Sequence, residues 1–101
     1  MRPAITDRQW RLLVLITEES SEVIKEKCKI ERSGPDFVPY ADEGRTATNL
    51  DNLKTELIDL YVVLGELIDD EEFISIGEFA ELRIAKLKKL ARFEPETFKD
   101  I

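Results

Sequence analysis

The chain has 101 residues, of which 43% are hydrophobic and 37% are charged, and its formal net charge is -7. This composition predicts one globular domain that spans residues 1–101, and it excludes a disordered chain. So acidic a chain is not expected to bind nucleic acid, because phosphate backbones are bound by clustered lysine and arginine. No apolar run of membrane-spanning length and no signal peptide is visible, so we expect a cytoplasmic protein with no membrane partner.

The cysteine and histidine content limits the redox compartment and the metal ligands that are possible for this chain. The single cysteine, Cys28, cannot form an internal disulfide, which suits a reducing compartment. Histidine is absent, which removes the commonest general base and the commonest zinc ligand. A metal ion bound by this chain is therefore expected to have oxygen ligands, which favours Mg²⁺, with Mn²⁺ as the alternative.

Three stretches have the periodicity of long helices, and they cover about residues 6–31, 48–69 and 75–93. The first begins with Thr6 and Gln9 at the spacing of a capping box, and the third begins in the same way with Ser75 and Glu78. A short helical turn is also expected near residues 71–74. The pattern predicts an all-α protein with three main helices.

A long connection, residues 32–47, joins the first two predicted helices. It contains helix-breaking residues and three apolar ones: Gly34, Pro35, Pro39 and Gly44, with Phe37, Val38 and Tyr40. The apolar residues predict that part of the connection docks on the helices. Long loops in compact domains are usually functional or disordered, so a substrate lid and a tolerated surface insertion both remain open.

The first two helices are predicted to be amphipathic. The apolar stripe of the first helix consists of Leu12, Leu15, Ile16, Val23 and Ile30. The stripe of the second helix consists of Leu53, Leu57, Leu60, Leu64 and Leu67. The second helix also carries Ile58 and Val62 on its other side. Three helices do not easily cover a helix that is apolar on two faces, so we expect homodimerisation to complete a four-helix-type core.

Two acidic pairs interrupt these stripes. Glu19 projects into the first stripe with Glu22 at its edge, and Glu56 and Asp59 take similar positions on the second helix. An ionised carboxylate is costly to bury unless it is paired or bound to a metal ion. No inward-facing basic residues on these helices offer an obvious partner. On this geometry alone, a metal site and a structural polar network both remain open.

The acidic residues also resemble a known family signature. Glu18-Glu19-Ser20-Ser21-Glu22, followed by Glu56-Leu57-Ile58-Asp59, is similar to the EExxE…ExxD motif of the MazG-like all-α nucleoside triphosphate pyrophosphohydrolases. The resemblance extends over residues 49–60 and the basic segment 83–90. It departs from the family in the longer interval between the acidic pairs, and in Ile58 where glycine is common.

The resemblance implies Mg²⁺-dependent hydrolysis of an NTP or dNTP to the monophosphate and pyrophosphate, in a homodimer or tetramer. The metal ligands and catalytic residues that it implies are Glu19, Glu22, Glu56 and Asp59. The basic residues that it places near the phosphates are Lys86, Arg83 and Lys89. Glu18 and Glu26 are further candidates for an extra ligand or the general base.

Trp10 is the only tryptophan, and it is expected on the helix face away from Glu19. It could stack on a nucleotide base, although a packing or interface role is more usual. Two other functions are compatible with the sequence: a non-catalytic acidic interaction module that retains the fold, and regulatory calcium or manganese binding without turnover.

Overall fold

The protein is described by a computed structural model, in which residues 5–98 are placed. Its elements are α1 (Asp7–Ser33), the 3-10 helix η1 (Ala41–Glu43), α2 (Asn49–Ile68), α3 (Ile76–Phe93) and α4 (Pro95–Phe98). No strand occurs between residues 5 and 98. The predicted all-α class and its three main helices are therefore confirmed, whereas η1 and α4 were not foreseen. None of the helices within this range is both long and apolar enough for a membrane span.

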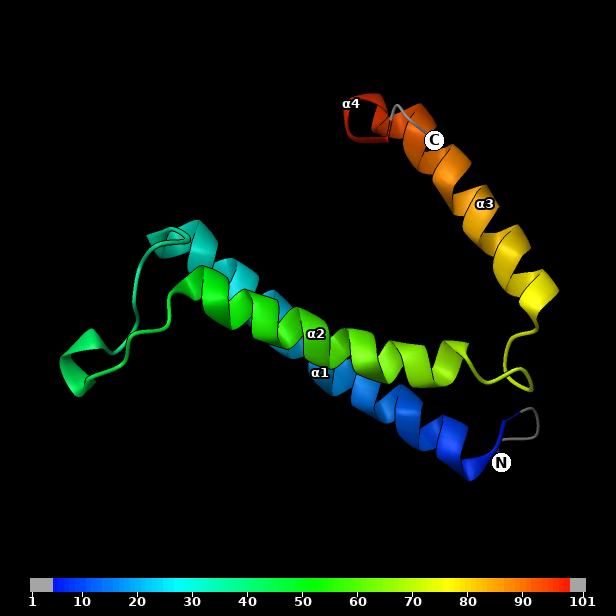
Figure 1. The fold of residues 1–101 in the computed structure, drawn as a ribbon, viewed down its shortest axis with the longest axis horizontal. Coiled ribbons are helices and arrows are strands. Elements are labelled where there is room, and N and C mark those ends of the chain that lie inside the picture. The colour runs from blue at the N-terminus through cyan, green and yellow to red at the C-terminus, as the bar shows by residue number, and fades with distance from the viewer. Residues whose placement is uncertain (1–4, 99–101) are drawn as a thin grey trace. The chain divides into compact units, whose positions relative to one another are not determined.

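The chain forms two compact units, Met1–Leu67 and Ile68–Ile101. The first unit contains α1, η1 and nearly all of α2, and the second contains α3 and α4 (Figure 1). All four of the acidic positions predicted to bind metal belong to the first unit.

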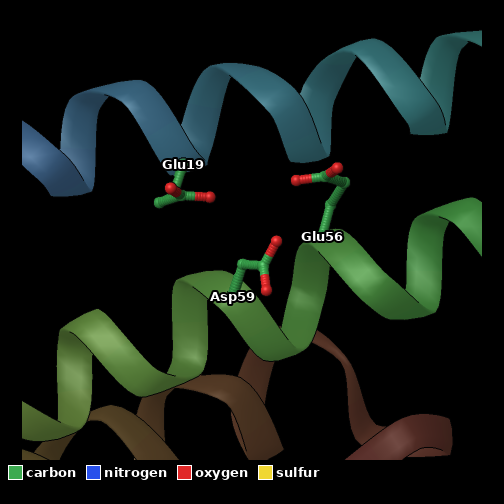
Figure 2. A group of neighbouring side chains, drawn as sticks. All are labelled: Glu19, Glu56 and Asp59. Atoms are coloured by element: carbon green, nitrogen blue, oxygen red, sulfur yellow. The ribbon is translucent and has the colours of Figure 1, made fainter.

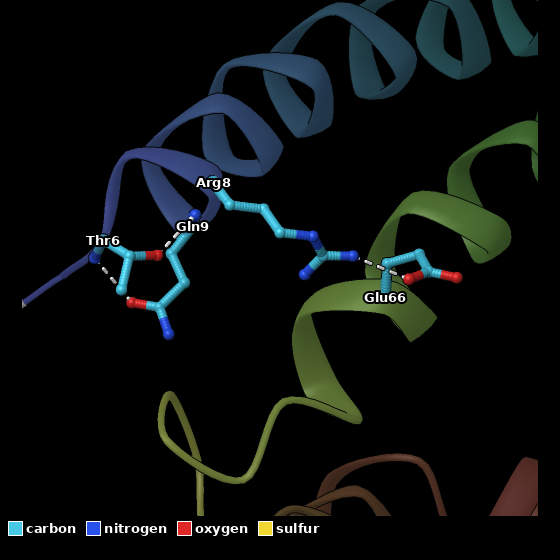
Figure 3. A network of polar contacts seen from close by, with 4 residues as sticks. All are labelled: Thr6, Arg8, Gln9 and Glu66. Atoms are coloured by element: carbon cyan, nitrogen blue, oxygen red, sulfur yellow. Dashed lines mark hydrogen bonds and ion pairs between the residues drawn. The ribbon is translucent and has the colours of Figure 1, made fainter.

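Both predicted capping boxes are present. At the start of α1, Gln9 donates its backbone N–H to the Thr6 hydroxyl at 3.0 Å, and the Gln9 side-chain oxygen accepts from the Thr6 backbone N–H at 2.9 Å (Figure 3). At the start of α3, Ser75 and Glu78 exchange the same two bonds, each 3.1 Å long. These reciprocal bonds satisfy first-turn N–H groups that have no partner inside a helix.

In the first unit α1 and α2 run side by side as an antiparallel hairpin (Figure 1). At the open end, the Arg8 guanidinium lies 2.8 Å from the Glu66 carboxylate (Figure 3). At the loop end, the Asn49 side-chain amide donates to the backbone carbonyl of Lys29 at 3.3 Å. These two contacts define the antiparallel direction and the register of the two helices, because they pair residue 8 with residue 66 and residue 29 with residue 49.

The face of α2 that packs against α1 differs in one respect from the predicted stripe. Leu67 and Asn49 are buried, and Leu53, Leu60 and Leu64 are half-buried, but Leu57 is 45% exposed. The buried face is centred on Asn49 and Leu67, and Leu57 lies about 80° around the helix from Leu67 at 100° per residue. The placement of Leu57 in the stripe was therefore wrong. On α1, the predicted stripe residues are all buried or half-buried.

The connection between α1 and α2 docks on the hairpin through its backbone. The carbonyl of Phe37 accepts from the Asn49 N–H at 2.8 Å, and the carbonyl of Pro35 accepts from the Leu50 N–H at 3.0 Å. Two first-turn donors of α2 are thereby satisfied by the loop. The expected docking is present, but the Phe37 and Tyr40 side chains remain exposed.

In the second unit, a hydrogen-bonded turn precedes α3, as expected for residues 71–74. The N–H groups of Phe73 and Ile74 both donate to the carbonyl of Asp70, at 2.9 and 3.0 Å. α3 ends before Pro95, also as expected, and α4 starts at this proline. Proline is favoured at the first position of a helix because its missing N–H would have no partner there.

Candidate functional site

Three of the predicted carboxylates converge between α1 and α2. Glu19, Glu56 and Asp59 each offer one oxygen, and these three oxygens all lie within 4.8 Å of one another. Figure 2 shows Glu19 extending from α1 toward α2, and Glu56 and Asp59 extending toward α1. The convergence joins residues that are almost forty positions apart in sequence, so it is a product of the hairpin.

Helix geometry explains why these three meet. Glu56 and Asp59 are three residues apart on α2, so they lie one above the other on the same side of the helix. The register set by the contacts of Arg8 with Glu66 and of Lys29 with Asn49 places position 19 of α1 opposite positions 55–59 of α2. The acidic pair and its partner carboxylate are thus held by the same packing that forms the hairpin.

The carboxylates of this group are held close together without compensation by cations. Glu19 and Glu56 are half-buried and Asp59 is exposed. Within residues 5–98 none of the three takes part in an ion pair or accepts a side-chain hydrogen bond. A structural polar network would require such partners, so the described residues do not form one around this group.

The electrostatic effect of this crowding is seen at Glu56. Burial raises the pKa of Glu56, and the negative charges of Asp59, Glu22, Glu19 and Glu26 raise this pKa further. A divalent cation would reverse the effect, because it stabilises the ionised form of every carboxylate around it. The group therefore has the donor set and the charge of a site for a hard cation such as Mg²⁺.

Glu22 and Glu26 complete the acidic surface of α1 in different ways. Glu22 is exposed and lies outside the group of three, yet its charge reaches Glu56. Glu26 is buried, at 7% exposure, and its Oε1 accepts from the Lys29 ammonium at 3.1 Å. Glu26 was predicted only as a lesser candidate. Its position two turns after Glu19 already placed it on the same face of α1.

The predicted substrate-binding residues lie outside this group. Arg83, Lys86 and Lys89 are exposed on α3, in the second unit of the chain. Trp10 is 46% exposed near the start of α1, more than two turns before Glu19. Their contact with substrate stays a prediction.

The arrangement as a whole can bind a hard divalent cation through carboxylate oxygens and, through that cation, a polyphosphate. Magnesium requires only a few carboxylates because it retains water ligands and accepts phosphate oxygens. Comparison with protein families, with curated proteins and with solved structures gave no match to this chain.

Proposed function

We propose that this chain is a Mg²⁺-dependent pyrophosphohydrolase that converts an NTP or dNTP to its monophosphate and pyrophosphate. The observation that carries the proposal is the convergence of Glu19, Glu56 and Asp59, which among the described residues have no cationic partner. The similarity of the acidic segments to the MazG-like signature supports the same reaction. Mn²⁺ has similar ligand preferences and is the alternative ion.

In this proposal the role of each residue follows from its position. Glu19, Glu56 and Asp59 would hold Mg²⁺, which would neutralise the phosphates and lower the pKa of a water molecule. Glu22 lies at the exposed edge, where it either completes the ligand set or takes the proton of the attacking water. The positively charged side chains of Lys86, Arg83 and Lys89 would bind the phosphate groups.

The proposal includes assembly with a second copy of the chain. α2 exposes the apolar side chains of Ile58, Tyr61 and Val62 on the side away from the α1 contact. Exposed apolar surface of this kind is typical of an interface. Pairing two hairpins through these faces gives the four-helix-type core expected for this sequence, as a dimer or within a tetramer.

Pyrophosphate release tests the proposed reaction. Purified chain is incubated with a panel of NTPs and dNTPs, with Mg²⁺ or with EDTA. We expect release from at least one substrate with Mg²⁺, and none with EDTA. Absence of release from every substrate at high enzyme concentration would overturn the proposal and favour the non-catalytic interaction module.

A further inference from the structure

The charges of the second unit are divided along the chain into an acidic segment and a basic segment. The acidic segment, residues 69–82, contains no basic side chain and has these acidic ones: Asp69, Asp70, Glu71, Glu72, Glu78 and Glu81. The basic segment, residues 83–92, contains no acidic side chain and has these basic ones: Arg83, Lys86, Lys88, Lys89 and Arg92. The boundary between the two segments falls near the middle of α3.

The charges of α3 are not compensated within the helix. Opposite charges three or four residues apart stabilise a helix, and like charges at these spacings destabilise it. In α3, Lys88 lies four residues before Arg92, and Glu78 lies three residues before Glu81. The helix macrodipole favours acidic residues in the first turn and basic residues in the last, but Glu81 and Lys88 lie outside these turns. Neither of these two residues forms an ion pair within residues 5–98, so opposite charges from outside the helix would stabilise it.

An apolar stripe runs along the same helix. At 100° per residue, its members lie within about 80° of one another around the helix: Ile76, Ala80, Ile84, Leu87 and Ala91. Ile76 is 71% exposed and Ile84 is 50% exposed. Ile84, Leu87 and Ala91, together with Lys88, also line a hollow of about 290 Å³. The stripe is thus partly uncovered in the single chain, and its spacings of three and four residues are those of a seam between paired helices.

Glu81 and Lys88 lie beside this stripe on the same side. They are seven residues apart, which separates them by only about 20° around the helix but by roughly 10 Å along its axis, too far for an ion pair within one helix. When two identical helices pack antiparallel about a two-fold axis, the same side of each helix meets its counterpart. Residues equally distant from the axis then lie opposite each other. A two-fold axis near Ile84 accordingly places Glu81 beside Lys88 of the partner subunit.

We propose that α3 pairs antiparallel with α3 of a second copy of this chain. The apolar stripe forms the seam, which is centred near Ile84, and Glu81 pairs with Lys88 of the partner subunit at two symmetric positions. Charge complementarity selects this orientation, because parallel pairing would place the two acidic segments together and the two basic segments together. Lys86 and Lys89 lie outside the stripe, so the pairing leaves them free to bind phosphate.

This inference goes beyond the proposed reaction and rests on α3 alone. The exposed side of α2 and the stripe of α3 each pair with their own copy, so both contacts can belong to one dimer. The α3 contact strengthens that dimer, and variants in the two helices report on the two contacts separately.

Charge reversal tests the pairing in the full-length chain. Sedimentation velocity over a concentration series gives the dissociation constant of the dimer. Lys88→Glu and Glu81→Lys are each expected to raise this constant at least about five-fold, because each sets like charges against each other at two positions. Neutralising Glu81 removes only an exposed attraction and has little effect, so reversal is the sharper change.

The double variant and a matched control complete this test. Lys88→Glu combined with Glu81→Lys re-forms the pair with the signs exchanged, so the constant should return to within about two-fold of the parent. Lys89→Glu makes the same charge change on the opposite face of α3 and should also stay within about two-fold of the parent. Single reversals that match the parent, a double variant as weak as the two changes combined, or a parent that is monomeric at every concentration would overturn the inference.

Disulfide trapping tests the orientation. Cys28 is the only cysteine, so Cys28→Ser gives a background without thiols. In this background Ile84→Cys places a thiol near the two-fold axis, and mild oxidation with diamide is expected to give a covalent dimer. Ile76→Cys should not crosslink, because antiparallel pairing separates the two copies of residue 76 by roughly 25 Å along the axis. Crosslinking at residue 76 would indicate parallel pairing, and crosslinking at neither position would show that α3 does not pair with a second copy; either result would overturn the inference.

The inference and the proposed reaction fail separately. Crosslinking at residue 84 without pyrophosphate release from any nucleotide would support the α3 pair and reject the reaction. Pyrophosphate release without this crosslink would support the reaction and reject the α3 pair.

Discussion

The side-chain amide of Asn49 lies 3.0 Å from the carbonyl oxygen of Gly34 and donates a hydrogen bond to it. The same nitrogen donates to the carbonyl of Lys29 at 3.3 Å. One buried residue at the start of α2 thus ties together the last turn of α1 and the beginning of the loop. It holds in place the loop end of the hairpin.

Asn49→Ala is expected to lower the free energy of unfolding by about 1–3 kcal/mol, because it removes these bonds from a buried site and leaves carbonyls without a donor. Guanidinium denaturation at a fixed protein concentration measures the effect. Asn52→Ala is the control, since Asn52 is half-buried but makes no side-chain hydrogen bond within the described part of the chain. Equal losses in the two variants would show that the Asn49 bonds do not stabilise the hairpin.

Glu56→Gln is expected to raise the melting temperature of the metal-free protein near neutral pH. Burial and neighbouring carboxylates raise the pKa of Glu56, so the folded state favours the protonated carboxyl group. Its contribution to stability is fully present below the unfolded pKa of about 4.3 and is lost as pH rises through the folded pKa. Glutamine carries no charge and avoids this loss.

The pH dependence separates this effect from a general change in packing. Calorimetry in EDTA from about pH 4 to neutral pH should show the difference between Glu56→Gln and the parent shrinking as the pH falls. Glu81→Gln, at an exposed position on α3, should change the melting temperature little at any pH. A gain for Glu56→Gln that is the same across the whole range would contradict the electrostatic explanation.

Magnesium should reverse the order of stability. The parent gains melting temperature with Mg²⁺ because the ion binds the folded site and not the unfolded chain. Glu56→Gln loses a ligand of the proposed site, so most of this gain should disappear, whereas Glu81→Gln should keep it. Scanning calorimetry with and without Mg²⁺ gives the comparison. A parent protein that shows no response to Mg²⁺ or Mn²⁺ would rule out the metal site.

Local sequence signals predicted the parts of the fold that depend on neighbouring residues. The capping boxes at Thr6 and Ser75 fixed two helix starts, because each needs only residues three positions apart. Helical periodicity placed Glu19 and Glu56 on inward faces, and the hairpin brings these faces together. These signals did not depend on knowing how the helices cross.

The features that the sequence left undetermined depend on the path of the loop and the phase of the helix contact. The exposure of Leu57 follows from a contact centred on Asn49 and Leu67, which periodicity alone does not fix. The burial of Glu26 and the left-handed backbone of Tyr40 arise where the loop folds back on the hairpin. These two features can be predicted only when the three-dimensional positions of segments far apart in sequence are known.

Arg8→Ala is expected to reduce the free energy of unfolding by less than about 1 kcal/mol. The Arg8–Glu66 ion pair is short, at 2.8 Å, but more than half of each side chain is exposed. Solvent screening and side-chain entropy offset most of the attraction in such a pair. Denaturation at low and high salt measures the contribution, which should decrease as salt is added. A loss comparable to that of Asn49→Ala would show that the open end of the hairpin depends on this pair.

Ile58→Glu is expected to convert the proposed dimer to monomer. Ile58 is 61% exposed in the single chain and lies among the apolar residues of the outer face of α2. A charge placed there would be buried without a partner if two copies pair through this face, so association should weaken by at least ten-fold. Sedimentation velocity across a concentration series measures the change. Thr17→Glu adds the same charge at an exposed polar position of α1, outside this face of α2, and should leave the assembly intact. If parent and Ile58→Glu sediment alike, α2 does not pair through this surface.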